Sequence, residues 1–422
     1  MEIFLKAGTD EGLTDAAIEE AVLASMAGRM LKRVLIVAPD FTRYHSNAGM
    51  ITNRYYHALE SAGCQVDILI ALGTHKPMPE SECDEMYCGI PFDKFLHHNW
   101  HSDVINLGEV SQAFTSQATE GLWSETVQVE VNRLIMDERY DLILSIGQVV
   151  PHEVVGMANH AKNILVGCGG SDMINKSHMM GAVYGMERMM GKDHTPVRDM
   201  FDYAMEKFLS QRPILHVLTV TTASAGKIRT HGLFIGEGRK PLEAATTLSQ
   251  EKNIDFVEQG INKCVVYLDP KEFKSTWLGN KSIYRTRMAV ADGGELLILA
   301  PGVERFGEDE EVDRLIRTYG YCGRLKVLEL FKQNEDLRAN MSAAAHLIHG
   351  SSDGRFTVTY AVDNITKAEI DAVHMKSADC DGMMRRYDPQ KLAYGWNTLA
   401  DGEVIFFIPN PALGLWIDRS RF

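Results

Sequence analysis

The sequence predicts an α/β protein of two α/β domains with mainly parallel sheets and an active-site cleft between them. The chain of 422 residues exceeds the usual size of one domain. Short runs rich in β-branched residues alternate with longer amphipathic runs, as strands alternate with helices. The short runs are almost continuously apolar, which is typical of parallel strands that helices cover on both faces.

Nine short apolar runs are predicted strands: residues 34–37, 66–71, 142–146, 164–166, 215–220, 263–268, 296–299, 356–360 and 404–408. Predicted helices cover about 47–62, 125–138, 241–251 and 308–317. In the first helix, Ile51, Tyr55 and Leu59 lie on one stripe, as helical spacing requires. The polar residues before it lie at a helix N-terminus, a natural site for anions.

A domain boundary is predicted between the helix that Pro241 opens and a new series of strands that begins at Lys263. We therefore expect an N-terminal cofactor-binding and catalytic domain of residues 1–255. A C-terminal domain of residues 256–403 is expected to close over the substrate. The last predicted strand is expected to cross back, so that residues 404–422 complete the N-terminal domain.

Composition and charge narrow the class of protein. The net charge of −14 opposes binding to nucleic acid or to an anionic membrane surface. No apolar run reaches the roughly 20 residues of a membrane helix, and the first five residues are too short for a signal peptide. The seven cysteines are dispersed without a CxxC, which indicates reduced thiols. We expect a cytoplasmic protein with a small-molecule partner.

Chemically versatile residues follow three of the predicted strands. Asp40, Thr42 and Arg43 come after the first strand, His75 follows the second, and His152 follows the strand at 142–146. Ligands of open α/β sheets bind beyond the carboxyl ends of the strands. These segments are therefore expected to converge on one cleft.

Beyond His152, a lysine follows after ten residues and a second histidine after sixteen more, at Lys162 and His178. These groups suit proton transfer, attachment of a cofactor and ligation of a metal. With Gly156 and the Asp-x-Thr-Arg motif at 40–43, the spacing resembles that of the nickel-dependent lactate racemase family. Members of that family interconvert the stereoisomers of 2-hydroxy acids.

The resemblance implies a nickel pincer nucleotide as cofactor, a pyridinium mononucleotide in which two sulfur-bearing arms and a ring carbon hold nickel. Lys162 would be joined to one arm, and His178 would be the fourth nickel ligand. Asp40 and Thr42 would hold the nucleotide. The resemblance also implies partner enzymes that synthesise the cofactor.

The substrate would be a small carboxylate. By the resemblance, Arg43 would grip its carboxylate in a bidentate manner, and Lys281 of the second domain would approach it. Inversion at C2 through a planar keto acid needs a hydride acceptor and a proton-transferring group on each face. His75 and His152 are the candidates for those two groups.

The chain departs from the family near the cofactor and the substrate. Ala158-Asn159-His160 replaces a Ser-Gly-Gly before the lysine, and Trp277 with Leu278 replaces a Tyr-Gln pair that faces the substrate. A family tryptophan is absent from the stretch that contains His346. Polar residues such as His346 discriminate in favour of substrates that carry hydroxyls. We expect a sugar acid, such as gluconate epimerised at C2; lactate and malate are the alternatives.

Two other classes of function stay open. His75, His152 and His178 are also a possible ligand set for zinc or iron in a hydrolase or lyase. A non-catalytic binding protein on the same fold is the other alternative. A Rossmann dehydrogenase is disfavoured because no GxGxxG follows the first strand.

Overall fold

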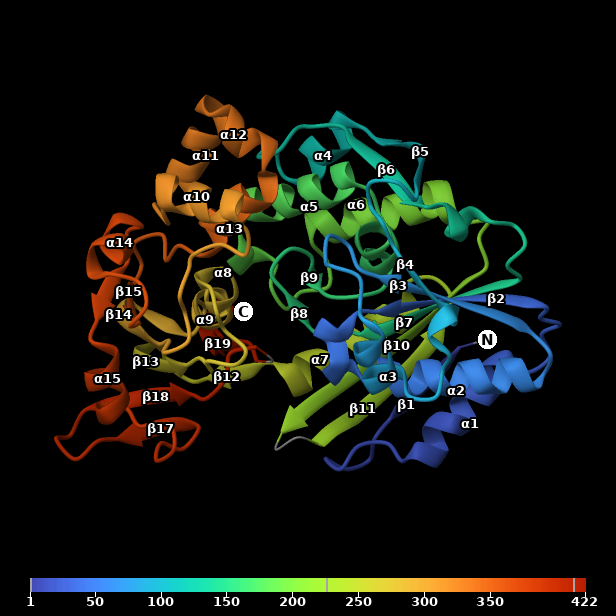
Figure 1. The fold of residues 1–422 in the computed structure, drawn as a ribbon, viewed down its shortest axis with the longest axis horizontal. Coiled ribbons are helices and arrows are strands. Elements are labelled where there is room, and N and C mark those ends of the chain that lie inside the picture. The colour runs from blue at the N-terminus through green and yellow to red at the C-terminus, as the bar shows by residue number, and fades with distance from the viewer. Residues whose placement is uncertain (1, 225–226, 413) are drawn as a thin grey trace. The chain divides into compact units, whose positions relative to one another are not determined.

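The computed structural model describes residues 2–224, 227–412 and 414–422 (Figure 1). The chain forms two compact units. Unit 1 contains Met1–Met180 and Arg188–Asn253, and unit 2 contains Gly181–Glu187 and Ile254–Phe422. Each unit has its own mainly parallel sheet with helices, so the predicted α/β class is confirmed.

The sheet of unit 1 has seven strands in the order β1-β11-β10-β7-β2-β3-β4. Their bounds are β1 Ile3–Lys6, β2 Arg33–Pro39, β3 Gln65–Ala71, β4 Phe95–His97, β7 Leu142–Gln148, β10 Ile214–Ser224 and β11 Lys227–Gly236. The strands from β10 to β4 are parallel, while β11 pairs antiparallel with β10 and β1. The central strands are apolar throughout because both faces are covered.

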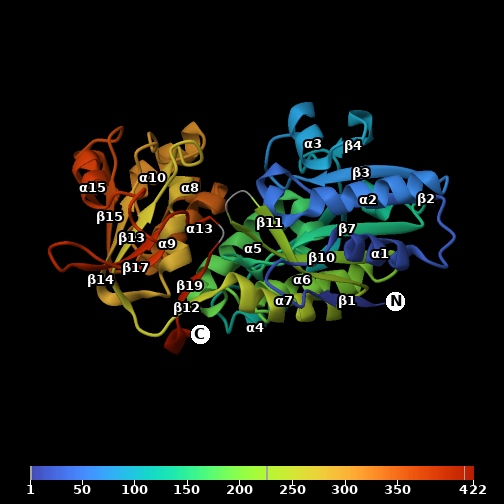
Figure 2. The same ribbon diagram turned by 90° about the horizontal axis from the view of Figure 1, so that it is seen from below.

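Different helices cover the two faces of this sheet. Helices α1 (Asp15–Met26) and α2 (Ala48–Ser61) contribute to one core with Val217 of β10. Helix α7 (Lys240–Asn253) packs in another core with Leu218, the next residue of the same strand. Because side chains alternate across a strand, these two cores lie on opposite faces. Figure 2 shows α2 running alongside β2 and β3.

The other elements of unit 1 surround the sheet. They are α3 Glu80–Tyr87, β5 Val104–Val110, α4 Gln112–Ala118, β6 Val127–Asn132, β8 Pro151–His152, β9 Gly156–Met157, α5 Ser171–Tyr184 (which ends in unit 2) and α6 Pro196–Ala204. Short 3-10 helices cover Phe41–Ser46, Phe92–Lys94 and Arg133–Met136, and a third helical type, the π-helix, covers Asn163–Gly167 and Met205–Leu209.

Two predicted elements of unit 1 were wrong. Most of the helix predicted at 125–138 is instead strand β6, which pairs with β5 in an antiparallel ribbon, and a short 3-10 helix follows at Arg133–Met136. Its buried Val127, Val129 and Val131 recur at every second residue, which is the strand period. The strand predicted at 164–166 is part of the π-helix Asn163–Gly167, since a short apolar run fits a buried helical turn equally well.

The sheet of unit 2 has six strands in the order β16-β15-β14-β13-β18-β17, and only β17 is antiparallel. The strands are β13 Ile261–Tyr267, β14 Val290–Leu299, β15 Thr357–Ala361, β16 Lys376–Ala378, β17 Gly395–Thr398 and β18 Val404–Ile408; β12 Asp255–Val257 pairs separately with β19 Trp416–Asp418. The helices are α8 Thr276–Gly279, α9 Lys281–Thr286, α10 Glu310–Tyr319, α11 Arg324–Gln333, α12 Glu335–Ala339, α13 Met341–His349, α14 Lys367–Ala372 and α15 Cys380–Arg386, with short 3-10 helices at Met186–Arg188, at the unit boundary, and at Arg419–Arg421.

The C-terminal segment does not return to the N-terminal unit as we expected. Residues 404–422 belong to unit 2, where β18 lies between β13 and β17. In that position Ile405 and Phe407 are fully buried in the core of the second sheet. Burial of two large apolar side chains in the centre of a sheet keeps this strand in unit 2.

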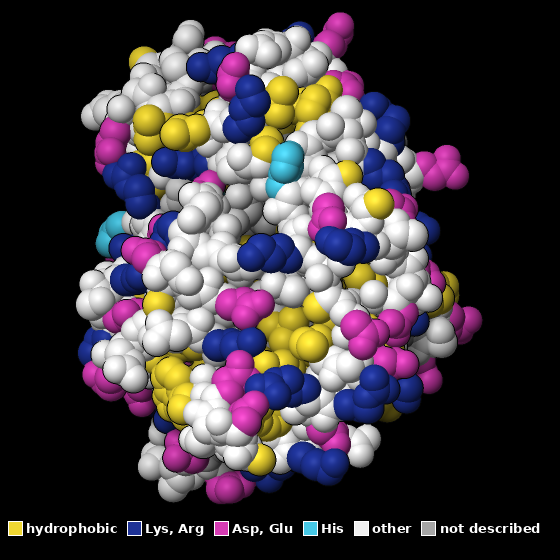
Figure 3. Space-filling view, turned by 90° about the vertical axis from the view of Figure 1, so that its left-hand side faces the viewer, with side chains coloured by type: hydrophobic (Ala, Val, Ile, Leu, Met, Phe, Trp, Pro, Cys, Tyr) yellow, Lys and Arg dark blue, Asp and Glu magenta, His cyan; other side chains and the backbone are white. Residues whose placement is uncertain are grey.

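The surface is mixed in charge. Figure 3 shows one face, on which Lys and Arg are interspersed with Asp and Glu, and hydrophobic side chains form small groups. Within the described part of the chain, none of the helices is both long and apolar enough to cross a membrane.

Candidate active site

Three neighbouring parallel strands of unit 1 end beside the predicted catalytic residues. Strands β7, β2 and β3 are adjacent in the sheet. Asp40 follows β2 directly, His75 lies four residues beyond β3, and His152 lies in the short β8–β9 hairpin after β7. Since these ends share one edge of the sheet, the topology places the three segments together, as parallel strand order requires.

Asp40 and His75 form a carboxylate–histidine pair. The distance between His75 Nδ1 and Asp40 Oδ2 is 2.5 Å, and the hydroxyl of Thr42 donates to Asp40 Oδ1 at 2.6 Å. Burial alone would raise the pKa of Asp40, but the bonds from His75 and Thr42 hold it below the ordinary value. An ionised Asp40 fixes the proton of His75 on Nδ1 and leaves a lone pair on Nε2. Asp40 and Thr42, the residues expected to hold the nucleotide, are thus bonded to each other, and Asp40 is bonded to His75.

His152 is held in a different tautomer from His75. Its ring is buried, and the backbone N–H of Val154 donates to Nδ1 at 3.1 Å. Burial lowers the pKa of His152 well below its usual value, opposed by the charge of Glu153 and assisted by Lys162 and Arg43. A neutral ring whose Nδ1 accepts a hydrogen bond carries its proton on Nε2.

Lys162 immediately precedes the π-helix Asn163–Gly167 and is partly buried. Burial and then the positive charge of Arg43 lower the pKa of its amine to about 8, while the carboxylate of Glu153 opposes the shift. A large fraction of the amine is therefore neutral near pH 8, where an ordinary lysine is almost fully protonated. A neutral amine is a nucleophile able to form a covalent bond.

His178 lies on α5, which begins just after the Gly169-Gly170 pair. Its Nδ1–H donates to the carbonyl of Ile174 at 2.6 Å. Burial lowers its pKa, and Lys162 is among the charges that act on it. The neutral ring therefore presents a lone pair on Nε2, and a metal-binding histidine is commonly oriented by such a bond from its other nitrogen.

The loop before Lys162 keeps a conformation that glycine favours, although it contains no glycine. Asn159 and His160 have φ angles of 67° and 59°. The ring of His160 contacts that of His216, with centroids 3.8 Å apart and an interplanar angle of 33°, and its Nε2–H donates to the carbonyl of Gly238 at 2.9 Å. Fully buried Arg198 donates to the carbonyl oxygen of Asn159 at 3.3 Å. Side-chain bonds thus compensate for the strain of two left-handed residues.

Two charged groups complete the cluster in unit 1. Arg43 is exposed at the end of β2 and acts electrostatically on both His152 and Lys162. Glu153, which sequence reasoning missed, lies with Oε2 3.9 Å from His152 Nδ1 and acts on Lys162 and His178 as well. The only signal in the sequence was its place next to His152.

The other predicted substrate residues belong to unit 2. Trp277 lies on α8, Lys281 opens α9, and His346 lies on α13. The rings of Trp277 and His346 are stacked with centroids 4.1 Å apart, and His346 Nε2 lies 3.1 Å from the hydroxyl of Tyr321. His346 is 7% exposed, and Trp277 is partly exposed.

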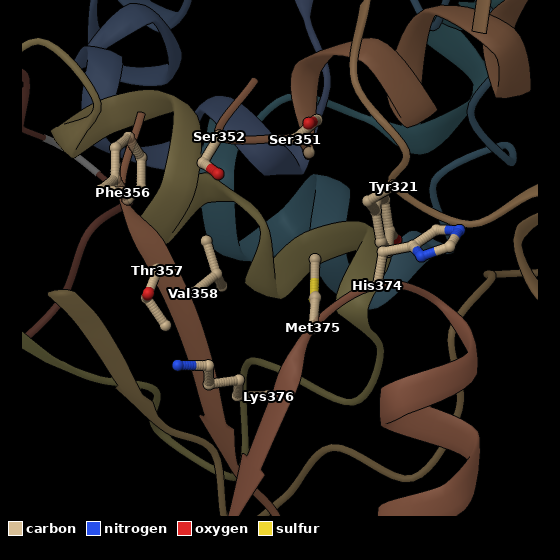
Figure 4. A pocket seen from close by; sticks show the side chains of 10 residues that line it. Tyr321, Ser351, Ser352, Phe356, Thr357, Val358, His374, Met375 and Lys376 are labelled. Atoms are coloured by element: carbon tan, nitrogen blue, oxygen red, sulfur yellow. The ribbon is translucent and has the colours of Figure 1, made fainter. Parts of the chain in front are cut away.

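Unit 2 also contains a cavity of about 170 Å³. Figure 4 shows Tyr321 and His374 near one another at this cavity, with Thr357 and Val358 on β15 and Lys376 on β16. None of the residues predicted for the site lines it.

Comparisons with known proteins identify the N-terminal part of the chain. The family described as lactate racemase N-terminal domain matches residues 11–191. A crystal structure of a protein from Thermotoga maritima is similar with a TM-score of 0.80 and 23% identity, covering 98% of this chain and 99% of that one. The lactate racemase apoprotein from Thermoanaerobacterium thermosaccharolyticum has a TM-score of 0.68 and 16% identity, with 94% and 92% covered. No curated protein matches the chain.

At these identities the two structures show a shared fold over nearly the whole length of this chain. The match over residues 11–191 includes Asp40, His75, His152, Lys162 and His178. It confirms the resemblance inferred from their spacing. Residues 11–191 of this protein therefore belong to the lactate racemase N-terminal domain family.

Proposed function

We propose that the protein is a racemase or epimerase that inverts C2 of a 2-hydroxy acid with a nickel pincer nucleotide. The observation that carries the proposal is the cluster in unit 1. Lys162 has a pKa of about 8, and His178 presents Nε2 to a metal. The two residues interact electrostatically with each other and with His152. Strongly shifted groups that interact at a sheet edge are typical of a functional site.

The residues present fit this cofactor. Lys162 supplies an amine that is partly neutral near pH 8, and His178 supplies one imidazole nitrogen, the donor type that suits nickel. Arg43 supplies positive charge for a phosphate or carboxylate. When bound, the nickel pincer nucleotide would supply a reversible acceptor for the hydride of C2.

The protein's own residues would bind and orient the substrate. The exposed guanidinium of Arg43 would hold the carboxylate. His75 and His152 would contact the hydroxyl group, one on each face of C2. The lone pair on His75 Nε2, fixed by Asp40, suits removal of the hydroxyl proton.

For the substrate we propose a sugar acid, with gluconate as the representative. Tyr44 and His45 follow Arg43 and are exposed, so they are available to bond to hydroxyls along a longer chain.

The first test is the metal content of the protein produced together with the enzymes that make the cofactor. We expect bound nickel and an added mass that survives denaturation if the bond to Lys162 forms. His178→Ala should lower the nickel content, because it removes the protein ligand proposed for the metal. His57→Ala, on the exposed face of α2, is the control and should retain nickel. Full nickel retention by His178→Ala would contradict the assignment.

The second test measures stereochemical exchange in the nickel-loaded protein. We expect gluconate-type acids to be epimerised at C2 with a kcat/KM at least about 10-fold above that for lactate, malate or phenyllactate, since bonds to hydroxyls discriminate strongly. A preference for lactate would overturn the sugar-acid proposal and leave the racemase proposal intact. Absence of exchange with every acid would favour a non-catalytic binding protein.

The rival metal-dependent hydrolase needs several protein ligands close to one ion. In the described ranges, no group of three or more His, Cys, Asp or Glu side chains is arranged to hold a metal. His75 and His152 instead make separate bonds through Nδ1, to Asp40 and from Val154. Zinc without nickel in the purified protein would favour the rival.

A further inference from the structure

His152 faces a chemical requirement that the described bonds do not meet. A neutral imidazole accepts a proton at Nε2 only when its other proton is on Nδ1. Likewise, it donates a proton from Nε2 without becoming an imidazolate only when Nδ1 is also protonated. Transfer in either direction therefore requires a hydrogen-bond acceptor for Nδ1–H.

The other two site histidines meet this requirement. Nδ1 of His75 donates to the carboxylate of Asp40, and Nδ1 of His178 donates to the carbonyl of Ile174. In contrast, Nδ1 of His152 accepts a hydrogen bond from a backbone N–H. In this tautomer His152 is able to donate its Nε2–H to a substrate oxygen, but it is not able to accept a proton at Nε2.

Glu153 is the carboxylate within reach of this nitrogen. Its Oε2 lies 3.9 Å from His152 Nδ1, about 1 Å beyond hydrogen-bond distance. The side chain of Glu153 is 23% exposed, whereas that of His152 is 8% exposed. Catalytic bonds that are long in a ligand-free protein commonly shorten in the loaded state.

We propose that Glu153 is the positioning residue of His152, as Asp40 is of His75, so that each face of the substrate meets a carboxylate–histidine pair. This inference rests on the racemase function proposed above. In the reactive state Nδ1–H of His152 donates to Glu153, and Nε2 exchanges the hydroxyl proton. One histidine takes the hydroxyl proton on one face of the substrate, and the other histidine returns a proton on the opposite face.

The charges around His152 explain why a carboxylate is needed there. Lys162, Arg43 and His178 all oppose a positive charge on the ring, whereas Glu153 favours it. Without Glu153, a transient imidazolium would lie near the positive charge of Arg43 in a buried position. Loss of its charge should therefore affect proton transfer more than substrate binding.

The first experiment requires neither cofactor nor substrate. Nitrogen NMR of the protein labelled with ¹⁵N-histidine reports which ring nitrogen of His152 carries the proton as the pH is lowered. We expect Nδ1 to gain its proton at a pH about one unit lower in Glu153→Gln than in the wild type. Glu206→Gln, an exposed control, should leave the midpoint unchanged. Equal midpoints, or a wild-type Nδ1 that never gains a proton, would overturn the proposal.

The second experiment is a double-mutant cycle in the nickel-loaded enzyme. Glu153→Gln is expected to lower kcat about 10²-fold with a much smaller change in KM, and Glu153→Asp should recover part of the loss. In the His152→Gln background, Glu153→Gln should have little further effect because the two residues act together. An equal loss in both backgrounds would show that Glu153 acts independently of His152. If no substrate is turned over at all, the proposed function fails while the NMR measurement still decides this proposal.

Discussion

Replacement of Lys162 by methionine should make the ligand-free protein more stable while eliminating turnover. Burial and Arg43 lower the pKa of the Lys162 amine to about 8, so the folded state binds this proton more weakly than the unfolded state does. Folding therefore carries a penalty that is complete below pH 8 and disappears as the pH rises toward 10.5. The gain at pH 7 should be about 2 kcal/mol, less than the full shift would give because water reaches part of the side chain.

Urea unfolding of the wild type and of Lys162→Met at pH 7 and pH 10 measures this difference. Lys176→Met is the matched control, since Lys176 lies on α5 in an ion pair with Asp172 at 2.8 Å and should gain nothing. The same Lys162→Met protein, produced with the cofactor-making enzymes, should carry no covalently attached mass. An unchanged or lower stability of Lys162→Met at pH 7 would contradict the proposed cost of burying the Lys162 charge.

Asp40→Asn should lower kcat by about 10²- to 10⁴-fold with a smaller change in KM. The asparagine amide is able to donate to His75 Nδ1, which would move the ring proton to Nε2 and remove the base. In serine proteases the equivalent change lowers kcat about 10⁴-fold for this reason. Steady-state kinetics of the nickel-loaded enzyme on its best 2-hydroxy acid, with nickel content measured in parallel, gives both constants.

Three further variants test the cause of this loss. Thr42→Val removes the hydroxyl that bonds to Asp40, so it should lower kcat less than Asp40→Asn does, and Thr42→Ser should restore it. Asp137→Asn, which disrupts only a bond to Arg139, is the unaffected control. If Asp40→Asn bound less cofactor while the loaded fraction kept near-normal kcat, Asp40 would hold the nucleotide as the family resemblance implied.

The sequence was sufficient for the architecture around the site. Continuous apolar runs marked β2, β3 and β7 because strands covered on both faces expose no polar side. Asp40 and His75 come just after two of these runs, and the rule for parallel strand ends predicted that they would meet. Their bond at 2.5 Å shows that they do.

Sequence patterns failed where a short segment suits more than one environment. The valines of β6 were assigned to a helix because their pairing partner, β5, is not visible in a local pattern. The C-terminal strand was assigned to the first domain, whereas its place between β13 and β17 depends on contacts far along the chain. Asn159 and His160 adopt left-handed angles, and they contact Arg198 and His216, which are both distant in sequence.

The residue types and their spacing were enough to indicate the family and the kind of chemistry, because an amine, imidazoles and a guanidinium keep their basic reactivity in any fold. The state of each group was decided only by the tertiary structure. A histidine becomes a base, a hydrogen-bond donor or a metal ligand according to what its second nitrogen meets, which is Asp40 for His75, Val154 for His152 and Ile174 for His178. Burial and neighbouring charges likewise set the pKa of Lys162, and both depend on atoms that the folded chain brings together.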